Sequence, residues 1–363
     1  MYSVSVSKRA NGKGWRAQAR YKDETGWHNT TKSLRGAATK TEAKRMAAQW
    51  LEELEQGSTE PRLAIACCEE YIERKAKLHS IQPSTAADYR KTLSGWMPYL
   101  EGAYLDQITP SMLADALEEM LSTSSSTTVL KRYVFLNSVL DKAVKDGLLA
   151  KNPLDSVPRP RKNPQPQNPI VGRELARLKE LLMRLKPSPW VIAVNLCLYA
   201  GLRAEEACGL KVADIDLASR TGWVRRAIGC ANGHHYVAPT KTKRTRDFPI
   251  CDALAQVLEP WMLGASQDDW LLTRSQTMPT GRSVGDRWSM LCDIIELRGR
   301  DGRKPTLHDL RHTFATQCVA AGMDIKTLQS ILGHSSAAMT LDIYASPDAS
   351  AKAAASAIID VAI

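Results

Sequence analysis

The chain has 363 residues, enough for two or three domains, because single hydrophobic cores seldom exceed about 250–300 residues. Its net charge of +10 favours a polyanionic partner. No apolar run reaches the roughly 18 residues of a membrane-spanning helix, and MYSVSVSKRA at the start has no apolar signal-peptide core. We therefore expect a cytoplasmic protein with no membrane partner.

Residues 1–58 are predicted to form a small basic domain. Apolar and polar residues alternate along 15–22, as in a strand with one buried and one cationic face, and a turn leads to a second strand. A capping-box pattern at Thr39 and Glu42 begins a helix. A three-stranded sheet backed by one helix fits a major groove, although a solvated charged face is the alternative. The cationic face consists of Arg16, Gln18, Arg20 and Lys22.

Residues 62–151 are predicted to form a compact four-helix bundle, because their pattern is helical throughout and the connections are short. A basic linker rich in proline follows at 152–169, where an extended, semi-rigid chain is expected. Such a tether would let two DNA-binding lobes close around a duplex from opposite sides, and a simple spacer remains a compatible interpretation. Its cations are Arg159, Arg161 and Lys162.

Residues 170–363 form the third predicted domain, mostly helical with a small antiparallel sheet. Arg203 and Glu206 stand one helical turn apart, which taken alone indicates an ordinary ion pair worth tenths of a kcal/mol. The segment TKTKRT is expected at a basic hairpin tip, between the last two of the predicted strands. Those strands cover residues 222–228, 235–239 and 245–250.

Eight cysteines show no CxxC spacing, and most lie in apolar surroundings, as reduced core thiols do. Cys230 with His234 and His235 resembles a metal site, but without a four-ligand spacing the cluster is interpreted as a hairpin loop.

The C-terminal part carries the residues of greatest chemical interest. Thr306 is a predicted helix cap, and His308 and Arg311 are neighbours on the following helix. A second helix, capped by Asp324, ends at a glycine directly before His334. An arginine and two histidines are able to grip a phosphate that a nearby tyrosine attacks. Each signal is weak alone, but their ordered combination is specific.

The segments TLHDLRHTFAT, ILGHSS and TLDIYA resemble the C-terminal signature of the tyrosine recombinases, the lambda-integrase-like family. Residues 1–58 resemble the arm-type DNA-binding domain of phage and integrative-element integrases, and 62–151 the core-binding, SAM-like domain. The resemblance thus implies a multidomain α+β protein whose catalytic domain covers 170–363. Val212, in place of a usual tryptophan, and Ser346, in place of a frequent histidine, depart from the pattern.

The resemblance implies a site-specific integrase that cuts and rejoins DNA through a 3′-phosphotyrosyl intermediate, with no metal and no nucleotide cofactor. It picks out Lys241 as the catalytic lysine, with Lys243 and Arg244 as alternatives that otherwise contact DNA. Glu206 is implied to support the first arginine. The implied catalytic set is Arg203, Lys241, His308, Arg311, His334 and Tyr344.

The partners implied are double-stranded DNA at core-type and arm-type attachment sites, a homotetramer on paired sites, a host DNA-bending protein and a directionality factor, in a bacterial nucleoid. Three rival functions remain: a non-catalytic DNA-binding regulator on the same fold, a type IB topoisomerase-like enzyme and a host chromosome-resolving recombinase. The intact catalytic set argues against the first, and the arm-like basic domain against the other two.

Overall fold

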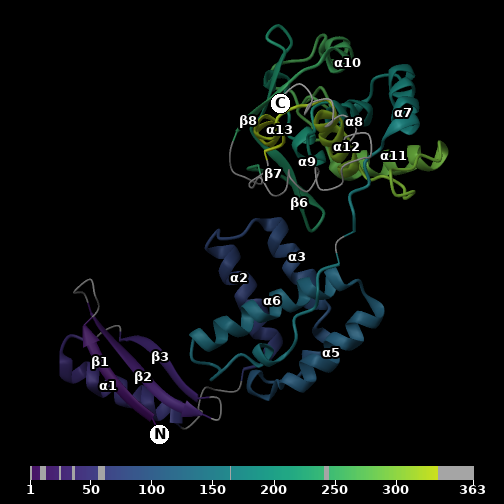
Figure 1. The fold of residues 1–363 in the computed structure, drawn as a ribbon. Coiled ribbons are helices and arrows are strands. Elements are labelled where there is room, and N and C mark those ends of the chain that lie inside the picture. Colours follow the sequence, from purple (N-terminus) through teal and green to yellow (C-terminus); the bar gives the residue numbers. More distant parts are fainter. Residues whose placement is uncertain are drawn as a thin grey trace, which may run out of the picture. The chain divides into compact units, whose positions relative to one another are not determined.

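The computed structural model describes residues 2–8, 14–23, 26–34, 37–55, 62–163, 165–240 and 245–333. The chain divides into two compact units, residues 1–164 and 165–363. Within the described residues both units are rich in helix and contain small antiparallel sheets (Figure 1), which confirms the predicted fold class. Among the same residues, no helix is both long and apolar enough to cross a membrane.

The first part of unit 1 is an antiparallel sheet in the order β1-β2-β3, backed by one helix. Strand alternation buries Ala17 and Ala19 against the helix, where they join Trp50 in a small core. The helix begins with the predicted capping box, since Glu42 accepts from the Thr39 backbone N–H at 3.2 Å and the Thr39 hydroxyl accepts from the Glu42 N–H at 3.2 Å. The elements are β1 Tyr2–Lys8, β2 Trp15–Asp23, β3 Gly26–Leu34 and α1 Lys40–Glu55.

The second part of unit 1 is a helix bundle around a core that includes Trp96, Leu136 and Leu140. Thr109 caps α5 by accepting from the Met112 N–H at 3.3 Å, with a proline at the next position. The helices are α2 Ala64–Lys77, α3 Pro83–Ser94, the short α4 Met97–Leu100, α5 Pro110–Thr123 and α6 Ser126–Lys145.

The beginning of the proline-rich segment packs against this bundle. A 3₁₀ turn, η2 Pro153–Ser156, buries Leu154 completely, and the Tyr133 hydroxyl donates to the Leu154 carbonyl at 3.3 Å. Asn152 is also buried and donates to Asp141 at 2.7 Å. The exposed part of the segment therefore begins after Val157, which is itself buried.

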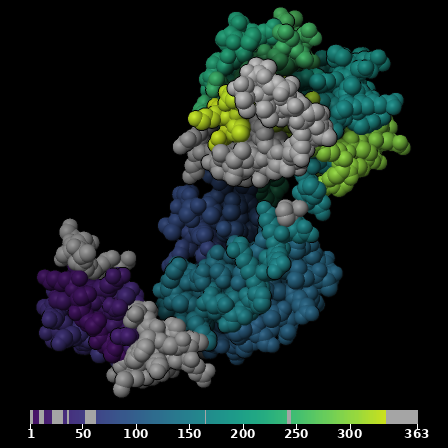
Figure 2. Space-filling model, in the orientation of Figure 1, coloured from purple at the N-terminus to yellow at the C-terminus, as the bar shows by residue number. Residues whose placement is uncertain are grey.

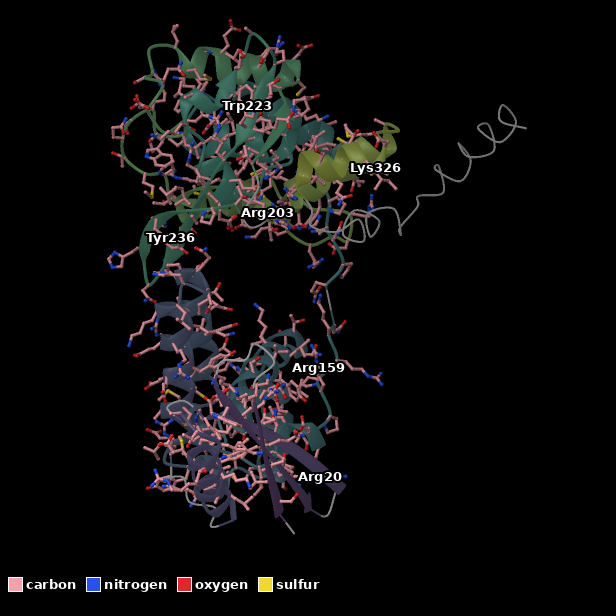
Figure 3. The ribbon with its side chains drawn as sticks, turned by 90° about the vertical axis from the view of Figure 1, so that its left-hand side faces the viewer. Arg20, Arg159, Arg203, Trp223, Tyr236 and Lys326 are labelled. Carbon is pink, nitrogen blue, oxygen red and sulfur yellow. The ribbon has the colours of Figure 1, made fainter. Side chains whose placement is uncertain are left out.

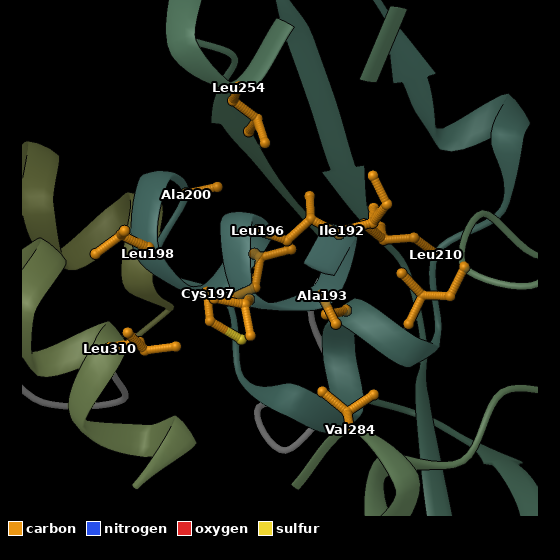
Figure 4. Close-up of a cluster of buried hydrophobic side chains, with 14 of the residues drawn as sticks. Ile192, Ala193, Leu196, Cys197, Leu198, Ala200, Leu210, Leu254, Val284 and Leu310 are labelled. Carbon is orange, nitrogen blue, oxygen red and sulfur yellow. The ribbon is translucent and has the colours of Figure 1, made fainter. Parts of the chain in front are cut away.

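Unit 2 is built around α8, which is apolar on all sides. Every residue from Val191 to Leu198 is buried, as expected of a helix that is covered by others in all directions. Figure 4 shows side chains of α8 in the middle, with Leu254 of α10, Val284 of α11 and Leu310 of α12 around them. Shortening one of these leucines to alanine costs about 2–5 kcal/mol in such a core. The helices are α7 Gly172–Arg184, α8 Pro189–Tyr199, α9 Ala204–Cys208, α10 Asp252–Met262, α11 Gly281–Ile294, α12 Leu307–Ala320 and α13 Ile325–Leu332.

The strands of unit 2 correct the sequence prediction in two places. The expected strand 222–228 is interrupted after Val224, because Arg225 and Arg226 turn back to the buried carboxylate of Asp214, at 2.7 and 2.5 Å. The expected hairpin between β7 and β8 is wrong, because β7 pairs with β6 whereas β8 pairs with β5. The strands are β4 Ile215–Asp216, β5 Thr221–Val224, β6 Ala227–Ala231, β7 His234–Ala238 and β8 Arg246–Pro249.

The segment TKTKRT, which contains Lys241, Lys243 and Arg244, therefore connects two different sheets instead of closing one hairpin. The β6–β7 hairpin turns at Asn232 and Gly233, both with positive φ, of 51° and 80°.

Candidate active site

The turn between α8 and α9 brings Arg203 beside α12. Gly201 in this turn has φ +64°, and a Cβ there would lie 2.5 Å from a ring carbon of Phe314. Both the conformation and the close approach therefore require glycine. In Figure 3, Arg203 lies between Tyr236 of the β6–β7 hairpin and Lys326 of α13.

Glu206 is a buried carboxylate shared by two arginines. Its side chain is 2% exposed and accepts from Arg203 Nη1 at 2.8 Å and from the Arg203 backbone N–H at 2.9 Å. Arg246 donates to both carboxylate oxygens, Nη1 at 3.0 Å and Nη2 at 2.6 Å. Burial by itself raises the pKa of Glu206, but the hydrogen bonds and charge of Arg246, together with the charge of Arg203, outweigh it and lower the pKa to about 2. The carboxyl group is therefore ionised at neutral pH.

This arrangement differs from the simple intrahelical pair that the spacing alone indicated. Arg203 precedes α9 as its N-cap residue, and the pair with Glu206 is buried and joined to a third residue from a distant strand. A buried, multiply hydrogen-bonded pair costs several kcal/mol to break from one side, against tenths for an exposed one.

Arg311 is held by backbone carbonyls. Nη1 donates to the Gly201 carbonyl and Nη2 to the Leu332 carbonyl, both at 2.7 Å, and the side chain is 2% exposed. Nη1 of Arg311 also lies 3.9 Å from a carboxylate oxygen of Glu206. Burial and the charge of Arg203 lower the pKa of Arg311 to about 9. The lowered pKa indicates a cation that an additional anion would stabilise.

Around the carboxylate of Glu206, the positive charges outnumber the single negative one. Arg203, Arg246 and Arg311 bring three positive charges to Glu206, the carboxylate that all three contact within the described residues. A surplus of positive charge around an accessible guanidinium, here Arg203 with a side chain 16% exposed, is the setting in which proteins bind phosphate.

His308 lies on the first turn of α12, three residues before Arg311. The helix begins with the predicted cap, since the Thr306 hydroxyl accepts from the Asp309 N–H at 3.3 Å. His308 is an exposed residue, but its ring is partly buried. This burial lowers the pKa of His308, and the charges of Arg311 and Arg203 lower it further. The imidazole is thus kept neutral and ready to accept a proton at pH 7.

Two further residues of this site were missed by sequence reasoning. His312 stacks edge-on against His308 with ring centroids 4.7 Å apart, and burial, then the charge of His308, lower its pKa to about 4. Arg246 binds Glu206, as described. Its signal was readable in the sequence. Arg246 and Phe248 share the buried face of β8, and buried Ile250 follows the strand at the same spacing. A buried arginine on such a face requires an anion.

Several predicted site residues lie outside the described residues, namely Lys241, Lys243, Arg244, His334 and Tyr344. The structure thus brings Arg203, Glu206, His308 and Arg311 together, and the roles of the other candidates stay predictions. Part of α13, the helix that precedes His334, reaches the surface of unit 2, where it is drawn yellow in Figure 2.

The candidate DNA contacts of unit 1 are exposed. Arg16, Gln18 and Arg20 alternate with buried alanines on β2, and Arg20 is labelled on the sheet in Figure 3. Lys22 follows on the same strand, but its side chain lies outside the described part. Arg159, Arg161 and Lys162 are exposed on the segment after the bundle.

A metal centre has no support from the part of the chain that the structure describes, which contains no group of three or more His, Cys, Asp or Glu residues arranged to hold an ion. Cys230, His234 and His235 lie on the β6–β7 hairpin, where Cys230 is opposite His235.

Comparison with known proteins identifies the family of this chain. Residues 176–351 match the phage integrase family, and residues 64–159 match the phage integrase SAM-like domain. The chain belongs to the tyrosine recombinases of the lambda-integrase type, which are site-specific DNA recombinases.

Particular relatives share this relationship at low identity. Tyrosine recombinase XerC of Roseiflexus castenholzii is 26% identical over 290 residues, which cover 75% of this chain and 86% of the relative. Tyrosine recombinase XerD of Oceanobacillus iheyensis is 24% identical over 276 residues, covering 72% and 86%.

Solved structures share the fold. The Tn1549 transposon integrase in complex with transposon right end DNA has a TM-score of 0.65 at 22% identity, covering 79% of this chain and 97% of that one. A lambda integrase dimer bound to a COC′ core site has a TM-score of 0.60 at 18% identity, covering 93% of both chains.

Proposed function

We propose that this recombinase is the integrase of a phage or other mobile element and that it cuts and rejoins double-stranded DNA through a 3′-phosphotyrosyl intermediate on Tyr344. The observation that carries the proposal is the surplus of positive charge at Arg203 and Arg311, beside a histidine kept neutral. A phosphodiester brings one negative charge, and more develops on its non-bridging oxygens as the phenol attacks.

The proposed reaction is a transfer of one phosphodiester bond. The Tyr344 oxygen forms a bond to phosphorus while the bond from phosphorus to the 5′-oxygen breaks. The phenolic proton passes to His308, because a phenol with a pKa near 10 is a weak nucleophile on its own. Lys241 protonates the departing 5′-oxygen, and a 5′-hydroxyl of the partner duplex later reverses the step. The phosphotyrosyl bond preserves the energy of the broken one, so that rejoining needs no nucleotide.

Arg203 and Arg311 neutralise the non-bridging oxygens, with His334 as a further hydrogen-bond donor. Removal of one donor of this kind typically lowers a rate about 100–1,000-fold. Within the proposal, Glu206 does not touch the DNA but holds Arg203 by the 2.8 Å contact to Nη1.

The N-terminal sheet is proposed to read arm-type sites in the major groove. Neighbouring strands lie about 4.8 Å apart, so the outer strands of a three-stranded sheet are about 10 Å apart, close to the roughly 12 Å width of the groove. Arg16, Gln18 and Arg20 line the exposed face of the central strand. Arg159, Arg161 and Lys162, with Lys243 and Arg244, are proposed as backbone contacts at the core site.

The proposed assembly is a homotetramer on paired attachment sites, with a host DNA-bending protein and a directionality factor. Another integrase of this fold, that of lambda, has been solved as a tetramer bound to a Holliday junction, which supports the same assembly here.

The nucleophile is tested with a suicide substrate, a core-site duplex nicked so that the cleaved 5′-end is lost by diffusion. Wild-type protein is expected to form a covalent adduct that survives denaturing electrophoresis, with label retained only when it is on the 3′-phosphate side. Tyr344→Phe is expected to bind the same DNA and form no adduct. Tyr236→Phe, a tyrosine of the β6–β7 hairpin, serves as the matched control and should retain the adduct.

An adduct that persists in Tyr344→Phe would overturn the assignment of the nucleophile. Cleavage of a single duplex with relaxation of supercoils, but no exchange between two sites, would favour a topoisomerase. DNA binding without any adduct in the wild-type protein would favour a regulator.

A further inference from the structure

All three guanidinium nitrogens of Arg246 donate hydrogen bonds within the protein. Nε donates to the Ile331 carbonyl at 2.8 Å, and the two terminal nitrogens donate to the two oxygens of Glu206. The side chain is 7% exposed, less than half the exposure of Arg203. Arg246 is therefore directed inward, whereas the side chain of Arg203 is partly exposed.

The contacts of Arg246 join three elements that are far apart in the sequence. Arg246 begins β8, Glu206 belongs to α9, and Ile331 lies in the last turn of α13. The segment with the candidate catalytic lysine immediately precedes β8, and His334 comes directly after the glycine that ends α13. One guanidinium thus fixes the chain beside two segments that carry proposed catalytic residues.

The end of α13 is shaped to accept this side chain. Gly333 has φ +64°, and a Cβ there would lie 2.9 Å from Cδ and 3.1 Å from Nε of Arg246. A side chain at position 333 would therefore displace Arg246 or the helix end. The glycine serves both the left-handed cap and the passage of the arginine beneath it.

We propose that Arg246 is a positioning residue for DNA cleavage: it holds Glu206 in the orientation that aims Arg203 at the scissile phosphate, and it anchors the end of α13 that leads to His334. This inference rests on the proposed function. Arg246 does not contact DNA in this proposal, and it acts through Glu206 and through the end of α13.

Lysine is not equivalent to arginine at this position. A single ammonium has no planar fork, so it cannot donate to both oxygens of Glu206 and, from a third nitrogen, to the Ile331 carbonyl. Arg246→Lys preserves the charge beside Glu206 but loses the geometry. A rate loss of about 100-fold is expected for a displacement of roughly 1 Å at a reacting centre.

The first experiment measures the single-turnover rate of covalent-complex formation on saturating suicide substrate. Arg246→Lys is expected to lower this rate about 100-fold while the Kd for the DNA stays near the wild-type value. Arg220→Lys is the matched control, because Arg220 also pairs with a carboxylate, Asp252 at 3.2 Å, but at the exposed far end of the same sheet. Its rate is expected to equal that of the wild type.

The second experiment separates positioning from general loss of structure. Glu206→Gln and the double variant with Arg246→Lys complete a double-mutant cycle. Because Arg246 acts in part through Glu206, the rate loss of the double variant is expected to be smaller than the product of the two single losses. A neutral methylphosphonate at the scissile position needs less charge neutralisation by Arg203. On this substrate the rate loss caused by Arg246→Lys is expected to be at least about 10-fold smaller.

The outcomes are distinguishable. A wild-type rate for Arg246→Lys, additive losses in the cycle, or equal losses on the phosphate and methylphosphonate substrates would overturn the positioning role while leaving the proposed function intact. Failure of the wild-type protein to form any adduct would overturn the proposed function itself. Thermal unfolding of each variant is measured in parallel. If Arg246→Lys does not fold, Arg246→Gln, which keeps one donor group, replaces it in the cycle.

Discussion

Arginines occupy two contrasting settings in this protein, the exposed face of the N-terminal sheet and the interior of the second unit. Arg16 and Arg20 are exposed and have serine or asparagine opposite them on the flanking strands. Arg246 and Arg311 are buried, and they bind backbone carbonyls and Glu206.

The difference shows which property of arginine matters in each place. An exposed guanidinium contributes mainly its charge, which the solvent and salt screen and which lysine also supplies. A buried guanidinium contributes several fixed donors at once, and removal of any of them leaves a carbonyl or carboxylate without its partner. Replacement by lysine therefore tests the comparison directly.

The largest effect is expected from Arg311→Lys. One ammonium cannot reach the Gly201 and Leu332 carbonyls together, so the charge that is proposed to neutralise the phosphate loses its fixed position. We expect the single-turnover cleavage rate to fall about 100–1,000-fold. The measurement is adduct formation on the suicide substrate, with Arg16→Lys as the exposed control. Equal rates for Arg311→Lys and Arg16→Lys would contradict the distinction between buried and exposed arginines.

An effect of intermediate size is expected on the stability of the protein when the pH is lowered. The pKa of Glu206, about 2 in the folded protein, lies below its ordinary value of 4.5, so the folded state binds this proton more weakly than the unfolded state. The resulting stabilisation, about 3 kcal/mol, is present in full above pH 4.5 and is lost as the pH falls toward 2.

Urea unfolding of the wild type and of Glu206→Gln between pH 7 and pH 3 measures this contribution. The stability difference between the two proteins is expected to shrink as the pH falls. A difference that stays constant with pH would show that the Glu206 charge contributes nothing to folding.

The smallest effects are expected on the N-terminal sheet. Arg20→Ala should weaken binding to an arm-site duplex and reduce the slope of log K against log salt by about 0.9, the value for one lost phosphate contact. Arg20→Lys should restore the slope, because the charge is what the phosphate recognises. A lysine variant as weak as the alanine variant would indicate a bidentate contact to a base instead.

Local signals in the sequence were sufficient for much of this architecture. Thr306 and Asp324 are capping residues whose side chains bind the first free backbone N–H groups of their helices. Gly333 ends α13 in the left-handed conformation that few other residues adopt. The alternation along β2 placed Arg16 and Arg20 on the exposed face. Each of these features depends on residues at most a few positions apart.

Pairing between distant segments was harder to predict. β7 and β8 were each recognised as strands, but the two are consecutive without being partners, because β8 pairs with β5 and leaves β7 to β6. The importance of Glu206 was underestimated for the same reason. Its second partner, Arg246, is 40 positions away, and a local spacing argument sees only Arg203.

The guanidiniums of Arg246 and Arg311 both bind the C-terminal end of α13. These contacts change the electrostatic field that an approaching anion meets. The aligned peptide groups of a helix place roughly half a negative charge at its C-terminus, and this end would repel a phosphate. Arg246 and Arg311 bind the carbonyls of Ile331 and Leu332, where that partial charge resides. The partial negative charge of this helix end is thereby offset beside the proposed phosphate site.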